Sequence, residues 1–217
     1  MNYTIMLITS FSILLPAIAG IVRYRKIDPS FRPFLILVWI GLANELLSVW
    51  VAENGHSNAI NSNIYVLVES LMITWQFRRW GNFERVPRMF YLLVAILIAG
   101  WGLENFYFFS IRSFSSWFRI LYSLIIVLMS VHQINRLILR ERGAMLKNPV
   151  FLICLGFIVY FTYKAIIETF WVYGLNTGRE FRINVYLILA WINFLVNCIF
   201  ALAILWIPTK LRFTLPS

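Results

Sequence analysis

Apolar segments long enough to cross a membrane recur along the whole chain of 217 residues. A transmembrane helix needs about 20 mainly apolar residues to span about 30 Å of hydrocarbon. Hydrophobic residues make up 61% of the chain and charged residues only 13%, which is more apolar surface than one water-soluble core can bury. We therefore expect an all-α, polytopic membrane protein that forms one domain over residues 1–217, with seven transmembrane helices at about 3–22, 34–51, 60–77, 89–108, 117–139, 148–173 and 183–207.

The Lys and Arg residues between these segments are divided unevenly, and this division predicts the orientation. Fourteen of them lie in the connections after the first, third and fifth segments, with Arg136 at the end of the fifth segment included, and in the C-terminal tail. The other connections hold only Arg112, Arg179 and Arg182. Because Lys and Arg are enriched in cytoplasmic loops, the N-terminus is expected outside and the C-terminus in the cytoplasm.

The net charge of +10 does not point to nucleic acid. The basic residues form short clusters between apolar segments, as cytoplasmic loops beside anionic lipid do. We therefore expect a lipid bilayer around the helices, no nucleic acid, and any cytoplasmic or membrane protein partner at the basic inner loops.

Six ionisable side chains lie inside the apolar segments. Lys164 and Glu168 are four residues apart in one segment and so share a helix face. On insertion scales a charge at the centre of the bilayer costs about 2.5 to 3.5 kcal/mol, so such side chains face the interior of a bundle and are functional candidates. We expect all six to meet in one cavity that is reached from outside: Glu45, Glu69, Glu104, Arg119, Lys164 and Glu168.

The balance of these charges points to a ligand or to bound protons. Four carboxylates face one lysine and one arginine, so either some carboxyls hold protons or a cation or an amine-bearing ligand completes the site. Tyr65 shares a helix face with Glu69, and Asn193 lies on the polar face of the last segment. The predicted ligand-binding residues are Glu45, Tyr65, Glu69, Glu104, Arg119, Lys164, Glu168 and Asn193.

Three functions are compatible with this pattern. We favour an outward-facing pocket that binds a small cationic or otherwise polar solute, for sensing or for permeation. In the second function the glutamates are neutral and hydrogen-bonded, and they only hold the helices in register within a structural membrane subunit. In the third, Glu45 and Glu69 act as acid and base on a lipid whose anionic headgroup binds Lys164.

The sequence contains no pattern typical of a nucleophile, a metal or a cofactor. Its two histidines lie on distant segments, and it has neither a Gly-x-Ser-x-Gly elbow nor a Gly-rich phosphate loop. Cys154 and Cys198 lie in apolar segments and are predicted to be small core side chains. We therefore predict no catalytic residue, no metal and no cofactor, and we favour binding over catalysis.

Several short motifs bring a resemblance to a known group of proteins. They are Asn44-Glu45, Asn63-x-Tyr65-x-x-x-Glu69, Asn148-Pro149-x-Phe151 with Tyr160-Phe161, and Trp191-x-Asn193-x-x-x-Asn197. In this order they resemble small bacterial seven-helix membrane proteins that have no assigned activity. The resemblance implies a multi-pass protein of the bacterial inner (plasma) membrane and implies no function.

The topology is also similar to that of microbial opsins and of the sugar transporters called SWEETs. The last segment has no lysine for a retinal Schiff base, which argues against an opsin. The proline and glutamine pairing expected in the repeat helices of SWEETs is absent as well.

Overall fold

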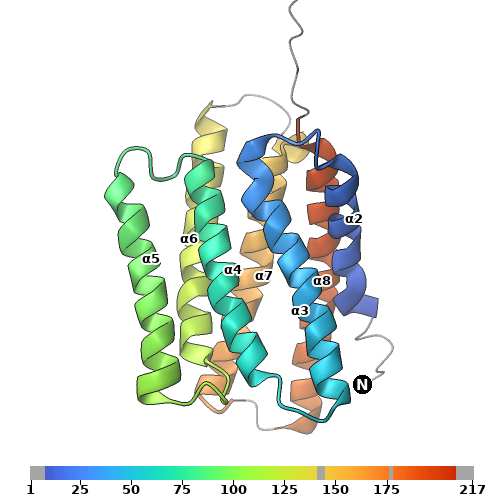
Figure 1. The fold of residues 1–217 in the computed structure, drawn as a ribbon, viewed down its shortest axis with the longest axis vertical. Helices are drawn as coiled ribbons and strands as arrows, with labels where there is room; N and C mark the ends of the chain where they lie inside the picture. The colour runs from blue at the N-terminus through green and yellow to red at the C-terminus, as the bar shows by residue number, and fades with distance from the viewer. Residues whose placement is uncertain (1–7, 141–144, 176–177, 209–217) are drawn as a thin grey trace, which may run out of the picture.

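The computed structural model describes residues 8–140, 145–175 and 178–208 as an all-α bundle (Figure 1). Successive helices run in opposite directions across the bundle. The described residues form seven α-helices: α2 (Leu14–Arg23), α3 (Arg32–Glu53), α4 (Ala59–Arg79), α5 (Pro87–Gly102), α6 (Ser116–Arg140), α7 (Pro149–Val172) and α8 (Arg179–Trp206). Three short 3-10 helices, η1 (Phe11–Ile13), η2 (Pro29–Phe31) and η4 (Met145–Lys147), and one π-helical turn, η3 (Leu103–Phe108), accompany them.

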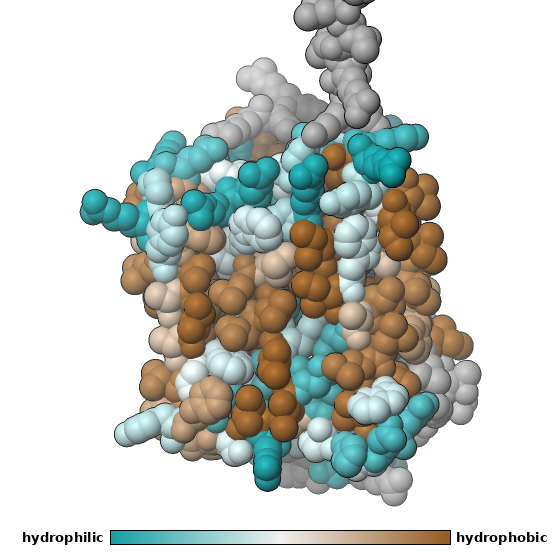
Figure 2. Space-filling view, viewed as in Figure 1, coloured by the Kyte–Doolittle hydropathy of each residue, from teal (hydrophilic) through white to brown (hydrophobic). Residues whose placement is uncertain are grey.

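The two ends of the bundle differ in composition. The α2–α3 and α4–α5 connections lie at one end, which we call the basic end because of Arg23, Arg25, Lys26, Arg78, Arg79, Arg85 and Arg88. The α3–α4 and α5–α6 connections and the start of α8 lie at the other. We call this the aromatic end because of its exposed Phe106, Tyr107, Phe108, Phe109, Phe114, Trp117 and Tyr173. Figure 2 shows a largely hydrophobic band between the two ends, with hydrophilic residues gathered at the basic end.

Five helical stretches are long and apolar enough to cross a membrane: Pro29–Glu53, Pro87–Phe108, Ser116–Leu139, Pro149–Val172 and Glu180–Trp206. Large apolar side chains on their surfaces are exposed, among them Leu46, Leu92 and Leu128. Surface of this kind suits lipid rather than water. The chain is therefore an integral multi-pass membrane protein, which confirms the expectation of an all-α polytopic fold.

Helices α2 and α4 meet only one of the two criteria, length and hydropathy, for crossing a membrane. The apolar helix over Ile8–Arg23 is short within the described residues. Helix α4 is long enough but polar, and its polar residues Asn63, Glu69, Thr74 and Gln76 are all buried. These four polar side chains therefore point into the bundle.

Side chains from one helix satisfy the free backbone groups at the end of another. At the start of α3, the side-chain amide of Gln76 on α4 makes two hydrogen bonds. Its oxygen accepts one from the backbone N–H of Phe34 (2.8 Å), and its nitrogen donates one to the carbonyl of Ser30 (2.7 Å). At the last turn of α8, the Arg23 guanidinium donates to the carbonyls of Ile204 and Ile207, both at 3.0 Å. The ends of a helix leave such groups without partners inside the helix, so these contacts fix α4 against α3 and α2 against α8.

Aromatic rings fill the core toward the basic end. Phe34, Phe157 and Phe200 pack edge to face, with ring centroids 5.1 to 6.2 Å apart. Gly156 leaves room for this contact, since a Cβ there would lie 2.5 Å from the Phe200 ring.

Apart from the start of the first helix, the predicted helix boundaries agree with the observed ones within four residues when η3 is counted as the last part of α5. The start of the first predicted helix, residues 3–7, lies outside the described residues.

Candidate functional site

A buried ion pair joins α7 to α4 in the middle of the bundle. The Lys164 ammonium lies 3.1 Å from Oε2 of Glu69. The Tyr122 hydroxyl, on α6, donates to the same oxygen at 2.6 Å. Glu69 is 6% exposed. Three helices therefore meet at one carboxylate, whose charge is compensated by a lysine and a hydroxyl.

Aromatic rings surround the ammonium of this pair. Lys164 Nζ lies 5.2, 5.3 and 5.5 Å from the ring centroids of Tyr122, Tyr160 and Phe161. Rings at this distance attract a cation electrostatically, and the attraction grows when water is excluded. Lys164 is thus held between its counter-ion and three rings.

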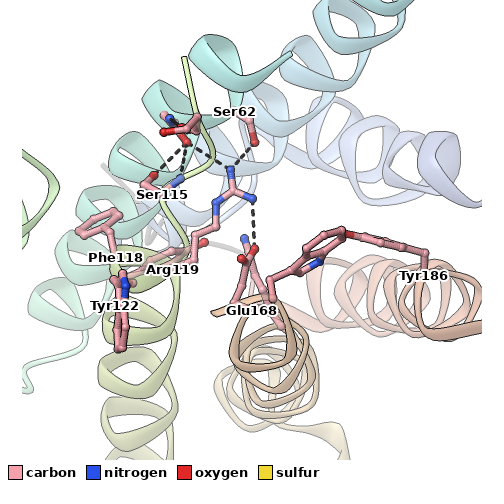
Figure 3. A network of polar contacts seen from close by, with 12 residues as sticks. Ser62, Ser115, Phe118, Arg119, Tyr122, Glu168 and Tyr186 are labelled. Atoms are coloured by element: carbon pink, nitrogen blue, oxygen red, sulfur yellow. Dashed lines mark hydrogen bonds and ion pairs between the residues drawn. The ribbon is translucent and has the colours of Figure 1, made fainter. Parts of the chain in front are cut away.

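A second buried ion pair lies closer to the aromatic end. Arg119 Nη1, on α6, is 3.2 Å from Oε1 of Glu168 on α7. Its Nη2 donates to the hydroxyl of Ser62 at 2.8 Å and lies 3.4 Å from Oδ1 of Asn63. Figure 3 shows the guanidinium of Arg119 between Ser62 and Glu168. This pair therefore links α4, α6 and α7.

Asn63 is the hub of the hydrogen bonds around this second pair, and it is fully buried. Its amide nitrogen lies within hydrogen-bonding distance of Asn105 Oδ1 and of the carbonyls of Ile111 and Ser113, at 2.6 to 3.1 Å. Its Oδ1 accepts from the backbone N–H and the hydroxyl of Ser115, at 3.1 and 2.9 Å. One side chain thereby holds the α5–α6 connection against α4.

Glu104 caps the start of α6 instead of joining a lysine or an arginine. Its carboxylate accepts hydrogen bonds from the backbone N–H groups of Trp117 (3.0 Å) and Phe118 (2.5 Å). The first turn of a helix has free N–H groups and favours negative charge. The π-helical turn η3 places both Glu104 and Asn105 among the buried residues.

Seven of the eight predicted residues line one or the other of two separate cavities, and Lys164 lines neither, so the structure does not bring them into the single cavity that was expected. The inner cavity, of about 100 Å³, lies between α3, α4, α7 and α8, and its polar lining is Ser10, Glu45, Tyr65, Glu69, Tyr160, Asn193 and Asn197. The aromatic-end cavity, of about 670 Å³, is lined by Glu104, Phe109, Ser113, Phe114, Ser116, Trp117, Arg119, Glu168, Trp171, Val172 and Tyr186.

Helix geometry explains this division. Lys164 and Glu168 do share a face of α7, but they are about 6 Å apart along its axis. Glu69 lies opposite the first of them and Arg119 opposite the second. Each charge is therefore paired locally. Glu69 of the first pair lines the inner cavity, whereas Arg119 and Glu168 of the second pair line the aromatic-end cavity.

Two important side chains were absent from the predicted site. Asn63 appeared only within a motif, and Tyr122 was not singled out. Tyr122 follows Arg119 by three residues and so lies on the same helix face, a spacing by which the sequence alone could have identified it.

Metal-binding side chains do not cluster in the described residues: no three His, Cys, Asp or Glu side chains lie together there as ligands of one ion would. The thiol of Cys154 is buried, and that of Cys198 is partly so. The chemistry available in the two cavities is therefore that of carboxylates, a guanidinium, amides, hydroxyls and aromatic faces.

Comparisons with protein-family models, with curated protein sequences and with solved structures find no match to this chain.

Proposed function

We propose that the chain spans the membrane seven times, with the basic end in the cytoplasm and the aromatic end outside. The excess of Lys and Arg at the basic end supports this orientation. The exposed rings at the opposite end suit the interface between lipid and water, where Trp and Tyr are enriched. A bacterial inner membrane, which the motif resemblance implies, is part of the same proposal.

Packing supports including the two weaker helices among the spans. Helix α4 turns its polar residues into the bundle, so its remaining surface can face lipid. The helix over Ile8–Arg23 lies against α8, where Asn197 donates to the Ser12 hydroxyl at 2.8 Å. At about 1.5 Å per residue its described part extends about 24 Å, close to the thickness of a bilayer core.

The aromatic-end cavity is proposed to bind a small cationic or otherwise polar solute from outside, for sensing or for permeation. Its volume of about 670 Å³ carries this proposal, since small-molecule sites measure about 300 to 1,000 Å³. Such sites combine apolar walls with a few placed polar groups. Here Trp117, Trp171 and Tyr186 supply the wall, and Arg119 and Glu168 supply the charges.

The charges of this cavity favour a ligand that carries an amine. Two carboxylates and one guanidinium line it, and the carboxylate of Glu104 is already bound to the start of α6. Aromatic faces attract cations, and Trp171 and Trp117 are 41% and 51% exposed. An ammonium group would therefore find aromatic contact area beside Glu168, whose ion pair with Arg119 is made through Oε1.

A thermal-shift screen of the purified protein in detergent tests this proposal, with amines, amino acids, sugars, metal cations and lipids as probes. A ligand present at 100 times its dissociation constant stabilises the folded state by about 2.7 kcal/mol, which raises the melting temperature measurably. We expect an amine-bearing probe to raise the melting temperature of the parent protein. Trp171→Leu should abolish the shift, because it removes a wall of the cavity at a partly exposed position.

Glu53→Gln is the matched control, since Glu53 is exposed in the α3–α4 connection region. It should keep the full ligand shift. A probe that still raises the melting temperature of Trp171→Leu binds elsewhere. If no probe raises the melting temperature of the parent protein, the proposal is contradicted. Flux of the identified probe into liposomes then separates permeation from sensing.

The alternative of a lipid-modifying enzyme gains no support from the site. Glu45 and Glu69, the paired carboxylates of that hypothesis, line the inner cavity of only about 100 Å³, and Glu69 is engaged by Lys164 and Tyr122. A lipid headgroup needs more space than this cavity offers.

A further inference from the structure

Glu45 differs from the other carboxylates of the membrane segments in its partners. Glu69 is paired with Lys164, Glu168 with Arg119, and Glu104 with the first amides of α6. In the part of the chain that the structure describes, no lysine or arginine lies within ion-pair distance of Glu45. Pairing therefore accounts for three of the four carboxylates and leaves this one uncompensated.

The surroundings of Glu45 are polar but carry no free positive charge. It lies on α3 and faces the inner cavity, whose lining includes Tyr65 and Glu69 on α4, Tyr160 on α7 and Asn193 on α8. The hydroxyl of Ser10, before η1, interacts with its carboxyl. The ammonium of Lys164, on α7, is bound to Glu69. An ionised Glu45 would thus add a second negative charge beside Glu69.

The cavity is the right size for water and too small for an organic solute. Its volume of about 100 Å³ corresponds to a few water molecules at about 30 Å³ each. A proton needs no space beyond that of these water molecules, and it is the cation that this carboxylate and this space fit.

A polar route leads toward Glu45 from the aromatic end. The amide of Asn61, on α4, donates to Oδ1 of Asn44 (3.0 Å), to Oγ of Ser48 (3.1 Å) and to Oδ1 of Asn58 (3.0 Å). Asn44 is the chain neighbour of Glu45, and both are only partly buried. Figure 2 shows hydrophilic side chains in the lower half of this face, between α3 and α4. Water can therefore approach the carboxyl along the α3–α4 contact.

We propose that Glu45 binds a proton in the inner cavity and exchanges it with water from the aromatic end. A carboxylate without a counter-ion at this depth is costly, and such a group is neutralised by taking up a proton. The other acid that lines this cavity, Glu69, is paired with Lys164 at 3.1 Å. This site lies in a different cavity from the proposed solute site and does not depend on it.

Infrared spectroscopy of the purified full-length protein, reconstituted in lipid, tests this proposal. A protonated glutamic acid has a carbonyl stretching band that an ionised one lacks. The parent protein should show this band at neutral pH, lose it as the pH is raised, and show its shift in deuterated water. Glu45→Gln should lack the band entirely, whereas Glu53→Gln, changed at an exposed position, should retain it with the same titration.

Each other outcome overturns a stated part of the inference. A band that persists in Glu45→Gln belongs to another residue, and the absence of the band in the parent means that Glu45 is ionised. A band that neither titrates nor shifts in deuterated water marks a permanently enclosed proton instead of exchange. Loss of the band when sodium replaces choline at constant pH would identify a metal cation as the ligand. Gel filtration and circular dichroism of Glu45→Gln show whether it is folded.

Discussion

At the scale of single residues, the carboxyl groups inside this protein have three different kinds of surroundings. Lys164 and Glu69 form an ion pair enclosed by rings, and Glu104 accepts hydrogen bonds from backbone amides. Glu45 has neither kind of partner among the described residues. Removing one member of a compensated pair should therefore be far more damaging than neutralising Glu45.

Glu69→Gln should destabilise the protein by about 3 to 5 kcal/mol, because it leaves the ammonium of Lys164 buried without a counter-ion. The double variant Glu69→Gln/Lys164→Met should lose less than the single one, since no uncompensated charge remains. Unfolding by denaturant in mixed micelles gives the free energies. Glu84→Gln is the control: Glu84 pairs with Arg136 at 3.9 Å with its side chain 73% exposed, and its loss should cost at most about 1 kcal/mol. Equal losses in Glu69→Gln and Glu84→Gln would contradict the assigned role of the buried pair.

At the scale of elements, α6 depends on contacts from other helices at its first turn. Glu104 caps it from the π-helical turn, and Asn63 holds the residues just before it from α4. The start of α6 also lines the aromatic-end cavity through Ser116, Trp117 and Arg119. The position of Arg119 in that cavity is therefore set by contacts far apart in the sequence.

Glu104→Ala should weaken the start of α6, because two backbone N–H groups lose their acceptor. Loss of an N-cap acceptor costs about 0.5 to 2 kcal/mol. Hydrogen exchange should become faster at the amides of Trp117 and Phe118, while the amides in the middle of α7 keep their protection. Unchanged exchange at these two amides would show that the cap does not stabilise the helix.

At the scale of the whole molecule, the two ends of the bundle are chemically distinct and the helices alternate in direction (Figure 1). This arrangement predicts which connections are exposed on which side of the membrane. It also separates the aromatic-end cavity, the proposed solute site, from the inner cavity with Glu45, the proposed proton site.

Cysteine labelling in whole cells tests the orientation. In a chain with Cys154 and Cys198 replaced by alanine, Ser57→Cys should react with a membrane-impermeant maleimide added outside, because Ser57 is exposed in the α3–α4 connection. Arg85→Cys, exposed in the α4–α5 connection, should react only after the cells are permeabilised. The reverse pattern would invert the topology, and labelling of both in intact cells would place both connections outside.

The sequence by itself determined the helical class, the helix boundaries and the residues that must avoid lipid, because hydropathy along one helix is a local property. It also indicated Lys164 and Glu168 as one face of α7. Only the tertiary structure decided that these two charges have separate partners, that Glu104 caps α6, and that Asn63 holds the α5–α6 connection. The physical reason is that pairing depends on the depth and rotation of each helix relative to its neighbours. Those quantities result from the packing of all the helices together, and they divide the expected single pocket into two.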